Sequence, residues 1–218
     1  MRRIMVVMLT MVTVYLFFTS LCFSETINIS AEVPPAHSLN LTLFKLNSHG
    51  TSNPNDDTGW NSPIHFPSPE FAIDFGELKL DEDLGIFTTN TYYALDCGVN
   101  GGGPWAIEHT VSGDIADKGP NSLGDNIIVT FCKVTKTKGD EGDVDVCDCD
   151  ALNKRMILAD ATDVKVTSTE LAGGWLRIFY GIATGDPDAE EPVNAVPITA
   201  TEKAGTQTGT IEITLSTP

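Results

Sequence analysis

Apolar and polar residues alternate along most of the chain after residue 25, with the period of two that is typical of half-buried β-strands. The first alternation places four apolar side chains on one side, namely Ile27, Ile29, Ala31 and Val33, and Pro34-Pro35 ends it. Shorter alternations follow at 39–43, 71–80, 93–97, 105–111 and 211–215. Denser apolar runs at 127–134 and 175–183 favour strands covered on both faces.

Helical periodicity is weak, and the best candidate for a helix is the short segment 151–159. The stretch from 47 to 69 contains Gly, Pro, Asn and Asp and predicts a long loop after the strands of 25–33 and 39–43. Short strands separated by turn residues predict an all-β fold, an antiparallel β-sandwich in one domain over residues 25–218.

The N-terminal segment predicts export. Arg2 and Arg3 precede an apolar run over 4–18, and a more polar stretch ends at Ser24, which together indicate a signal peptide of residues 1–24. An uncleaved membrane anchor and a lipoprotein attached through Cys22 are the alternatives, although a bulky residue before that cysteine is unfavourable for lipidation. No later segment is long and apolar enough to span a membrane. We therefore expect a protein that passes through the periplasm and is secreted or held at the cell surface.

The chain is acidic, with 30 Asp and Glu against 13 Lys and Arg and a formal net charge of −17. This balance argues against nucleic acid and anionic lipid as partners, because both require a basic surface. Hydrophobic residues make up 41% of the chain, which is sufficient for a folded core.

Four cysteines follow the predicted leader, and an oxidising compartment favours disulfides between them: Cys97, Cys132, Cys147 and Cys149. Four cysteines allow three connectivities. A bond between Cys147 and Cys149 would close a very small, strained ring. We therefore expect each of these two to pair with Cys97 or Cys132.

The segment 139–150 is rich in acids and offers candidate calcium ligands at Asp140, Asp143, Asp145 and Asp148. It lacks the glycine and terminal glutamate of an EF-hand loop. The same alternation is typical of a solvated strand whose charge prevents unwanted pairing, and this is the favoured interpretation. Calcium is the only cofactor that the sequence suggests.

No motif for catalysis is present: the chain lacks a nucleophile elbow, a zinc-protease helix, a phosphate-binding loop and a dinucleotide fingerprint. The four histidines show no metal-ligand spacing. His109 lies on the apolar side of its predicted strand, so we expect it to be buried and hydrogen-bonded, with Glu108 on the opposite side. We do not expect an enzyme.

Three segments carry a resemblance to known proteins: the opening strand Thr26–Val33, the turn Asp74-Phe75-Gly76, and the closing segment Ala204–Leu215. Together they resemble secreted bacterial proteins of the fimbrial-subunit and spore-coat-U type. The resemblance implies an immunoglobulin-like sandwich and a structural or adhesive role in surface fibres or a coat. It also implies a periplasmic chaperone as partner, although the chain lacks the tyrosine that pilins commonly have near the C-terminus.

In fimbrial assembly a neighbour's N-terminal strand completes each sandwich, and strand addition of this kind uses main-chain hydrogen bonds and alternate side chains. The resemblance makes Ile27, Ile29, Ala31 and Val33 the candidate donor residues and a second copy or related subunit the partner. The competing interpretation is that this strand pairs within its own domain. A different function, a secreted calcium- or carbohydrate-binding module, would use the 47–69 loop and the acidic hairpin.

Overall fold

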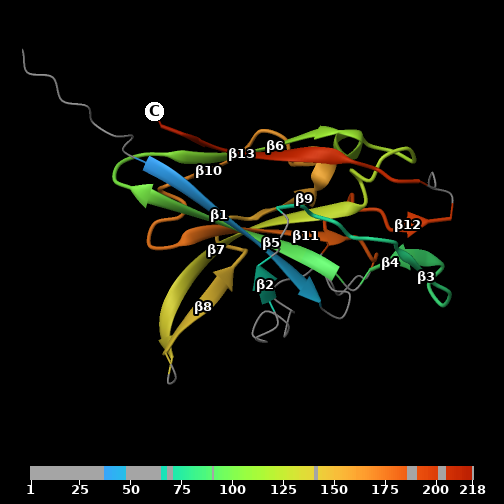
Figure 1. Ribbon diagram of the computed structural model, residues 1–218, viewed down its shortest axis with the longest axis horizontal. Coiled ribbons are helices and arrows are strands. Elements are labelled where there is room, and N and C mark those ends of the chain that lie inside the picture. The colour runs from blue at the N-terminus through green and yellow to red at the C-terminus, as the bar shows by residue number, and fades with distance from the viewer. Residues whose placement is uncertain are drawn as a thin grey trace, which may run out of the picture. The chain divides into compact units, whose positions relative to one another are not determined.

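The computed structural model describes residues 37–47, 65–67, 71–89, 91–139, 142–185, 191–200 and 205–217. Side chains at 47, 65–67, 139 and 142–144 lie outside this description. The compact unit formed by these residues runs from Pro35 to Pro218 (Figure 1). Its described part consists of antiparallel strands and two short 3-10 turns, η1 (Asp114–Ala116) and η2 (Leu158–Asp160). The predicted all-β class is therefore confirmed.

The largest sheet has seven strands, all antiparallel to their neighbours. Across the sheet they follow the order β2 (His65–Pro67), β1 (His37–Asn47), β5 (Thr91–Gly101), β11 (Trp175–Ile182), β7 (Ile127–Gly139) and β8 (Gly142–Asp148). The seventh strand, β9 (Lys154–Ile157), pairs with the first half of β7, and β8 pairs with the second half. The long β7 thus supports two short strands along one edge.

The described residues also form two smaller sheets, each of three antiparallel strands. One follows the order β10 (Val164–Thr167), β6 (Ala106–Gly113), β13 (Gly209–Ser216). The other follows the order β12 (Ile198–Thr199), β4 (Ile86–Thr88), β3 (Lys79–Asp81). At one end of the β6–β13 ladder Gly113 has a φ of +87°, and a Cβ there would lie 2.9 Å from the Cα of Gly209, so this pairing requires glycine.

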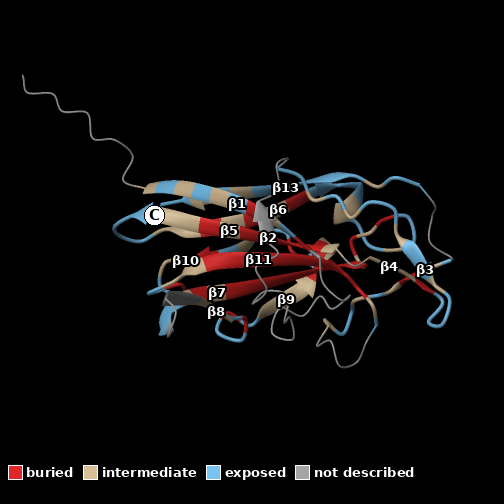
Figure 2. Ribbon diagram, turned by 60° about the horizontal axis from the view of Figure 1, so that its bottom comes forward, coloured by how far each residue is buried: buried red, intermediate tan, exposed pale blue. Residues whose placement is uncertain are grey.

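The main core lies between the large sheet and the β10–β6–β13 sheet, because strand alternation sends one side chain in two toward it. Leu95 of β5 and Ile178 of β11 meet Ile107 and Val111 of β6 in this core. The predicted coverage of 127–134 and 175–183 on both faces is confirmed, since nearly every residue of β11 is buried (Figure 2). Each fully buried aliphatic side chain of this kind stabilises the fold by about 1.5–3 kcal/mol.

The predicted helix at 151–159 is wrong. Residues Lys154–Ile157 form β9 against β7, and only Leu158–Asp160 make a 3-10 turn. The weak helical period is overridden by ladder formation, because the extended segment buries Ile157 and the 3-10 turn after it buries Leu158.

The predicted alternation over 71–80 is regular only at its end, in β3. Residues 71–78 are irregular, yet Ile73, Phe75 and Leu78 still pack against the core. The bend predicted at Gly76 is present, with φ at +68° and its N–H donating to Oδ1 of Asp74 at 2.8 Å. Apolar periodicity here indicates burial and not a ladder.

The predicted signal peptide over 1–24 and the strand over 25–33 lie outside the described residues, as does most of the 47–69 loop. Inside that predicted loop, His65–Pro67 form β2 against β1. Among the described residues, no helix is long and apolar enough to cross a bilayer.

Candidate functional site

The last strand of the chain, β13, is an edge strand with an apolar inner side. All eight of its residues pair with β6, and in the described part of the chain β6 is the only ladder partner of β13. Its inner side chains, Ile211, Ile213 and Leu215, pack against the core yet remain half-buried. In contrast, Ile107 and Val111 of neighbouring β6 are buried. The core is therefore less completely covered along β13.

β1 of the large sheet is also incompletely covered along part of its length. β1 pairs with β5 along its whole length, whereas β2 pairs with β1 only at residues 44–46. In the remaining part, Leu39 and Leu41 point to the core and are half-buried. β1 and β13 are neighbours across the two sheets. We call this line of half-covered side chains the β1–β13 seam, formed by Leu39, Leu41, Ile211, Ile213 and Leu215.

Two buried polar atoms flank the seam. Nε2 of His37 and Oε1 of Gln207 are buried and have no hydrogen-bond partner among the described residues. His37 begins β1, and Gln207 lies two residues before the start of β13. Buried polar atoms are normally hydrogen-bonded in folded proteins. These two atoms are therefore exceptions to that rule among the described residues.

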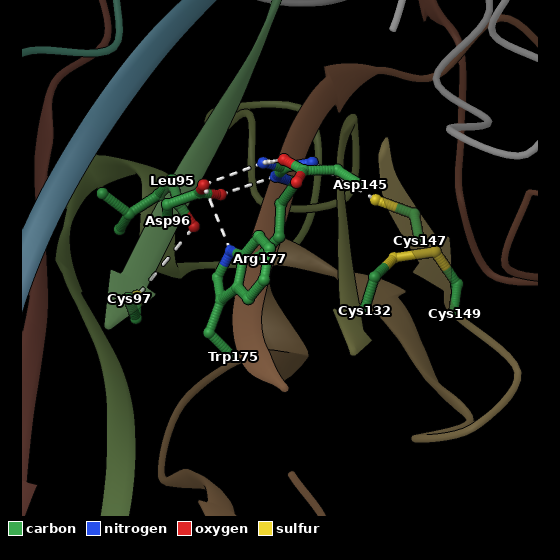
Figure 3. Close-up of polar contacts among 9 residues, drawn as sticks. All are labelled: Leu95, Asp96, Cys97, Cys132, Asp145, Cys147, Cys149, Trp175 and Arg177. Carbon is green, nitrogen blue, oxygen red and sulfur yellow. Dashed lines mark hydrogen bonds and ion pairs between the residues drawn. A yellow bond between two sulfur atoms is a disulfide. The ribbon is translucent and has the colours of Figure 1, made fainter. Parts of the chain in front are cut away.

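A different arrangement is centred on Arg177 of β11, a central strand of the large sheet, and reaches toward the edge strand β8 (Figure 3). Its guanidinium forms a bidentate ion pair with Asp96 of β5, at 2.5 Å from Nε to Oδ1 and 2.8 Å from Nη2 to Oδ2. The same carboxylate accepts a hydrogen bond from Nε1 of Trp175 at 3.2 Å. Arg177 also reaches β8, where Nη1 lies 3.4 Å from Sγ of Cys147 and Nη2 lies 3.5 Å from Oδ2 of Asp145.

Arg177 is 1% exposed, so its charge depends on these partners. Burial lowers the pKa of Arg177, but its hydrogen bonds and charge interaction with Asp96 outweigh burial and raise that pKa above its ordinary value. A bidentate guanidinium–carboxylate pair is also geometrically specific. The pair therefore ties the central strands β5 and β11 to each other and to the edge strand β8.

The cysteine predictions are half right. Cys132 and Cys149 form a disulfide between β7 and the end of β8, as expected for Cys149. Cys97 and Cys147 are both unpaired, so the expected bond for Cys147 is wrong. The reason is the sheet itself: Cys97 of β5 points into the main core, whereas Cys147 lies on the other face with the disulfide (Figure 3). Burial raises the pKa of Cys97 well above its ordinary value, which favours the protonated thiol.

The four candidate calcium ligands do not converge as far as their side chains are described. Asp145 faces Arg177 on one side of β8. Asp148 lies on the opposite side, where its Oδ1 accepts a hydrogen bond from the N–H of Ala151 at 2.9 Å. Asp140 and the side chain of Asp143 lie outside the described residues. Among the described residues, no cluster of three or more acidic, histidine or cysteine side chains could hold a metal ion. Calcium binding stays a prediction.

His109 is buried and hydrogen-bonded, as predicted. Its Nδ1 lies 2.5 Å from the carbonyl oxygen of Ala161, which can only accept, so Nδ1 carries the proton. Nε2 lies 3.1 Å from the hydroxyl of Tyr180 in β11, which places this histidine between the two sheets. Burial lowers the pKa of His109. Glu108 points outward and pairs with Lys165 at 3.4 Å, as the alternation requires.

Comparisons with protein-family models, with curated proteins and with solved structures find no match to this chain. The candidate sites therefore depend on their own geometry. Sequence reasoning missed Arg177 and Asp96, although one signal was present: a cation inside the apolar run 175–183 requires a buried anion. It also missed the incomplete cover of β1, because which strands form edges depends on how the sheets are ordered.

Proposed function

We propose that the protein is a secreted structural or adhesive surface subunit that joins to other subunits by strand addition at the β1–β13 seam. The proposal is carried by two observations: β6 is the only ladder partner of β13 among the described residues, and the inner side chains of β13 are half-buried, namely Ile211, Ile213 and Leu215. An added strand would bond to the open main-chain groups and cover the apolar side chains. Head-to-tail addition of this kind produces an open filament or coat.

The donor we propose is residues 25–33 of a second copy. Ile27, Ile29, Ala31 and Val33 repeat every second residue, the period with which one side of an added strand meets the seam. In this donor only Glu25 and Glu32 are charged, and Pro34-Pro35 separates it from β1. A periplasmic chaperone would be the partner that protects the seam before assembly.

The added strand at the seam could come from a second copy or from the same chain. The direction of β1 and β13 distinguishes these two origins. His37 pairs with Gly101 at the end of β5, and Ser216 pairs with Ala106 at the start of β6, so β1 begins where β13 ends. Residues 34–36 span at most about 14 Å between residue 33 and His37. This is shorter than β13, whose eight residues extend over about 26 Å.

It follows that residues 25–33 can enter their own seam only parallel to β13. A strand that runs antiparallel to β13 must come from a second copy. Antiparallel pairing is also slightly more stable per residue. The direction of the added strand therefore reports its origin.

The test uses a variant that lacks residues 25–33 and a synthetic peptide of the same sequence. We expect the variant to stay folded, to form no fibres in electron micrographs, and to bind the peptide antiparallel to β13. A spin label at either peptide end would give the direction by relaxation of β13 amides. The matched control is a peptide with Ile29→Pro, which removes a main-chain donor and should bind at least tenfold more weakly. Normal fibres from the deletion variant would overturn the proposal.

A further inference from the structure

Three cysteine sulfurs lie together on one face of the large sheet, and only two of them are bonded. Cys132 of β7 is joined to Cys149, and Cys147 packs against the same small apolar cluster. Val134 faces Cys147 in the ladder of β7 and β8, so the next position on that face brings Cys149 opposite Cys132. Cys147 is thus the neighbour of the disulfide, two residues away along β8 (Figure 3).

A bond from Cys132 to Cys147 requires a change of register. In the present ladder these two residues stand in diagonal positions, for which Cα atoms lie about 7–8 Å apart. Disulfides usually join Cα atoms about 4.4–6.8 Å apart. Movement of β8 by two residues along β7 brings Cys147 opposite Cys132, and because the side-chain period is two, the residues of β8 up to Cys147 keep their face. Phe131, the next residue of β7, pairs with Lys154 of β9, so Asp148 and Cys149 would leave the ladder and lengthen the connection to β9.

We propose that Cys132, Cys147 and Cys149 form a thiol–disulfide exchange site, in which Cys132 pairs either with Cys147 of β8 or with Cys149, which follows β8. The Cys132–Cys147 form holds β8 two residues further along β7 than the Cys132–Cys149 form. This inference is independent of strand addition at the β1–β13 seam. The two forms differ at the edge of the large sheet that is opposite to β1.

The exchange balances within the chain. The Cys147 thiol releases its proton, and the thiolate sulfur attacks Sγ of Cys132. The Cys132–Cys147 bond forms as the Cys132–Cys149 bond breaks, and Cys149 leaves as a thiolate that takes up a proton. One disulfide and one thiol are present before and after, so no oxidant or reductant is consumed.

The composition of the two strands suits both registers. At present Lys136 faces Asp145 and Lys138 faces Asp143. After a shift of two residues the register would place Asp143 opposite Lys136, so an aspartate position still faces this lysine. The pair of Lys133 and Asp148 would be lost.

The turn and the buried arginine also accept the shift. The shifted ladder would connect through Gly139-Asp140, and glycine in the first position suits a two-residue hairpin turn. Asp145 would take the place of Cys147, whose Sγ is now 3.4 Å from Nη1 of Arg177. A carboxylate there would give the guanidinium a charged partner in place of a thiol.

The local charges set how fast exchange proceeds. Burial raises the pKa of Cys147, and the nearby Arg177 opposes this rise only in part. The protonated thiol therefore predominates at neutral pH, and the thiolate is the attacking form. Below that pKa the exchange rate should rise by about tenfold for each pH unit.

The first experiment asks whether Cys147 can replace Cys149. Thiols are counted in denaturant with and without prior reduction, after equilibration of the folded protein in a glutathione redox buffer. Cys149→Ser should gain two thiols on reduction, as the wild type does. Cys132→Ser, the matched control, should gain none. In folded Cys149→Ser, nuclear Overhauser contacts should join Lys136 to residue 143 in place of 145.

The second experiment asks whether the wild type exchanges, and it does not depend on a variant that folds. The folded protein is equilibrated at pH 8 with trace thiol, quenched with acid and cleaved at Asp148, which separates Cys147 from Cys149. We expect Cys132 in linkage with both fragments, whereas Cys147→Ser should give one linkage. A wild type with the Cys132–Cys149 linkage alone, or Cys149→Ser without a disulfide, would overturn the proposal.

Discussion

The two edge strands β8 and β13 differ in how their unpaired main-chain groups are protected from pairing with another strand. β8 is acidic, and each lysine of the second half of β7 faces one of its aspartates: Lys133, Lys136 and Lys138. Its end is tied by the disulfide and its middle by Arg177. β13 has no such protection in the described part of the chain, and its inner apolar side chains are half-buried. An edge strand with little charge and little cover is a template for another strand.

This difference indicates which of the two edge strands would accept an added strand. Charge on an edge strand raises the cost of adding a further strand beside it, because a second acidic strand would be repelled and its carboxylates desolvated. β13 carries one acid, Glu212, and its outward side chains are otherwise hydroxyls. We expect assembly at β13, and at β8 only rearrangement within the chain.

We expect the largest loss of stability from a substitution that removes the ion pair beside β8. Arg177→Met leaves the carboxylate of Asp96 without its ion-pair partner in a site where its side chain is 19% exposed. We expect a loss of about 3–5 kcal/mol in the free energy of unfolding by urea, and faster amide exchange in β8 than in β13. Lys165→Met is the control, because it removes an exposed pair with Glu108 and should cost at most about 1 kcal/mol. Equal losses in both variants would contradict this account.

A smaller effect concerns β13. Ile213→Lys places a charge at a half-buried position of the seam, whereas Thr214→Lys places it on the exposed outer side. We expect the first to lower the free energy of unfolding by about 1–2 kcal/mol and to reduce self-association, measured by sedimentation. The second should change stability by less than about 0.5 kcal/mol. Self-association that falls equally in both would show that net charge, and not the seam, controls assembly.

The smallest expected effect is a dependence of stability on pH that appears near β13 before it appears near β8. Because burial lowers the pKa of His109 in the folded protein, the unfolded chain binds more protons once the pH falls below the ordinary value of about 6.5. Stability that is present at neutral pH is therefore lost on acidification, by up to about 0.7 kcal/mol between pH 7 and pH 6. His109 lies on β6 beside β13, so amide exchange should rise there before it rises in β8.

The matched variant for the pH effect is His109→Gln. It keeps a side chain that can donate to Ala161, and it has no proton to gain in this range. Unfolding by urea at pH 7 and pH 6 should show a smaller pH dependence in the variant than in the wild type. An identical dependence in the two proteins would assign the effect to other groups.

Local pattern was sufficient for the strands that use alternation. Ile211, Ile213 and Leu215 face the core as their spacing predicts, and the dense run that begins at Trp175 is covered on both faces. The apolar pattern gave the wrong secondary structure where side-chain burial does not coincide with strand pairing. Within residues 71–78, Ile73, Phe75 and Leu78 are partly buried without a regular strand. Lys154–Ile157 pairs with β7 although its period resembles a short helix.

The candidate sites were less accessible to sequence reasoning, for a reason of distance along the chain. Asp96 and Arg177 are 81 residues apart, and nothing in either segment indicates the other. The cysteines could be counted, but their pairing depends on which face of the sheet each occupies. The alternation of 25–33 suggested a strand that could be donated, whereas only the order of the strands shows an edge that could receive it.

The sequence by itself determined the all-β class, the inward side of most strands and the burial of His109, because each follows from side-chain periodicity within a few residues. The tertiary structure decided the rest: which strands are edges, which cysteine meets Cys132, and which anion holds Arg177. These depend on pairings between distant segments, where the gain comes from burial and hydrogen bonds that no local pattern encodes.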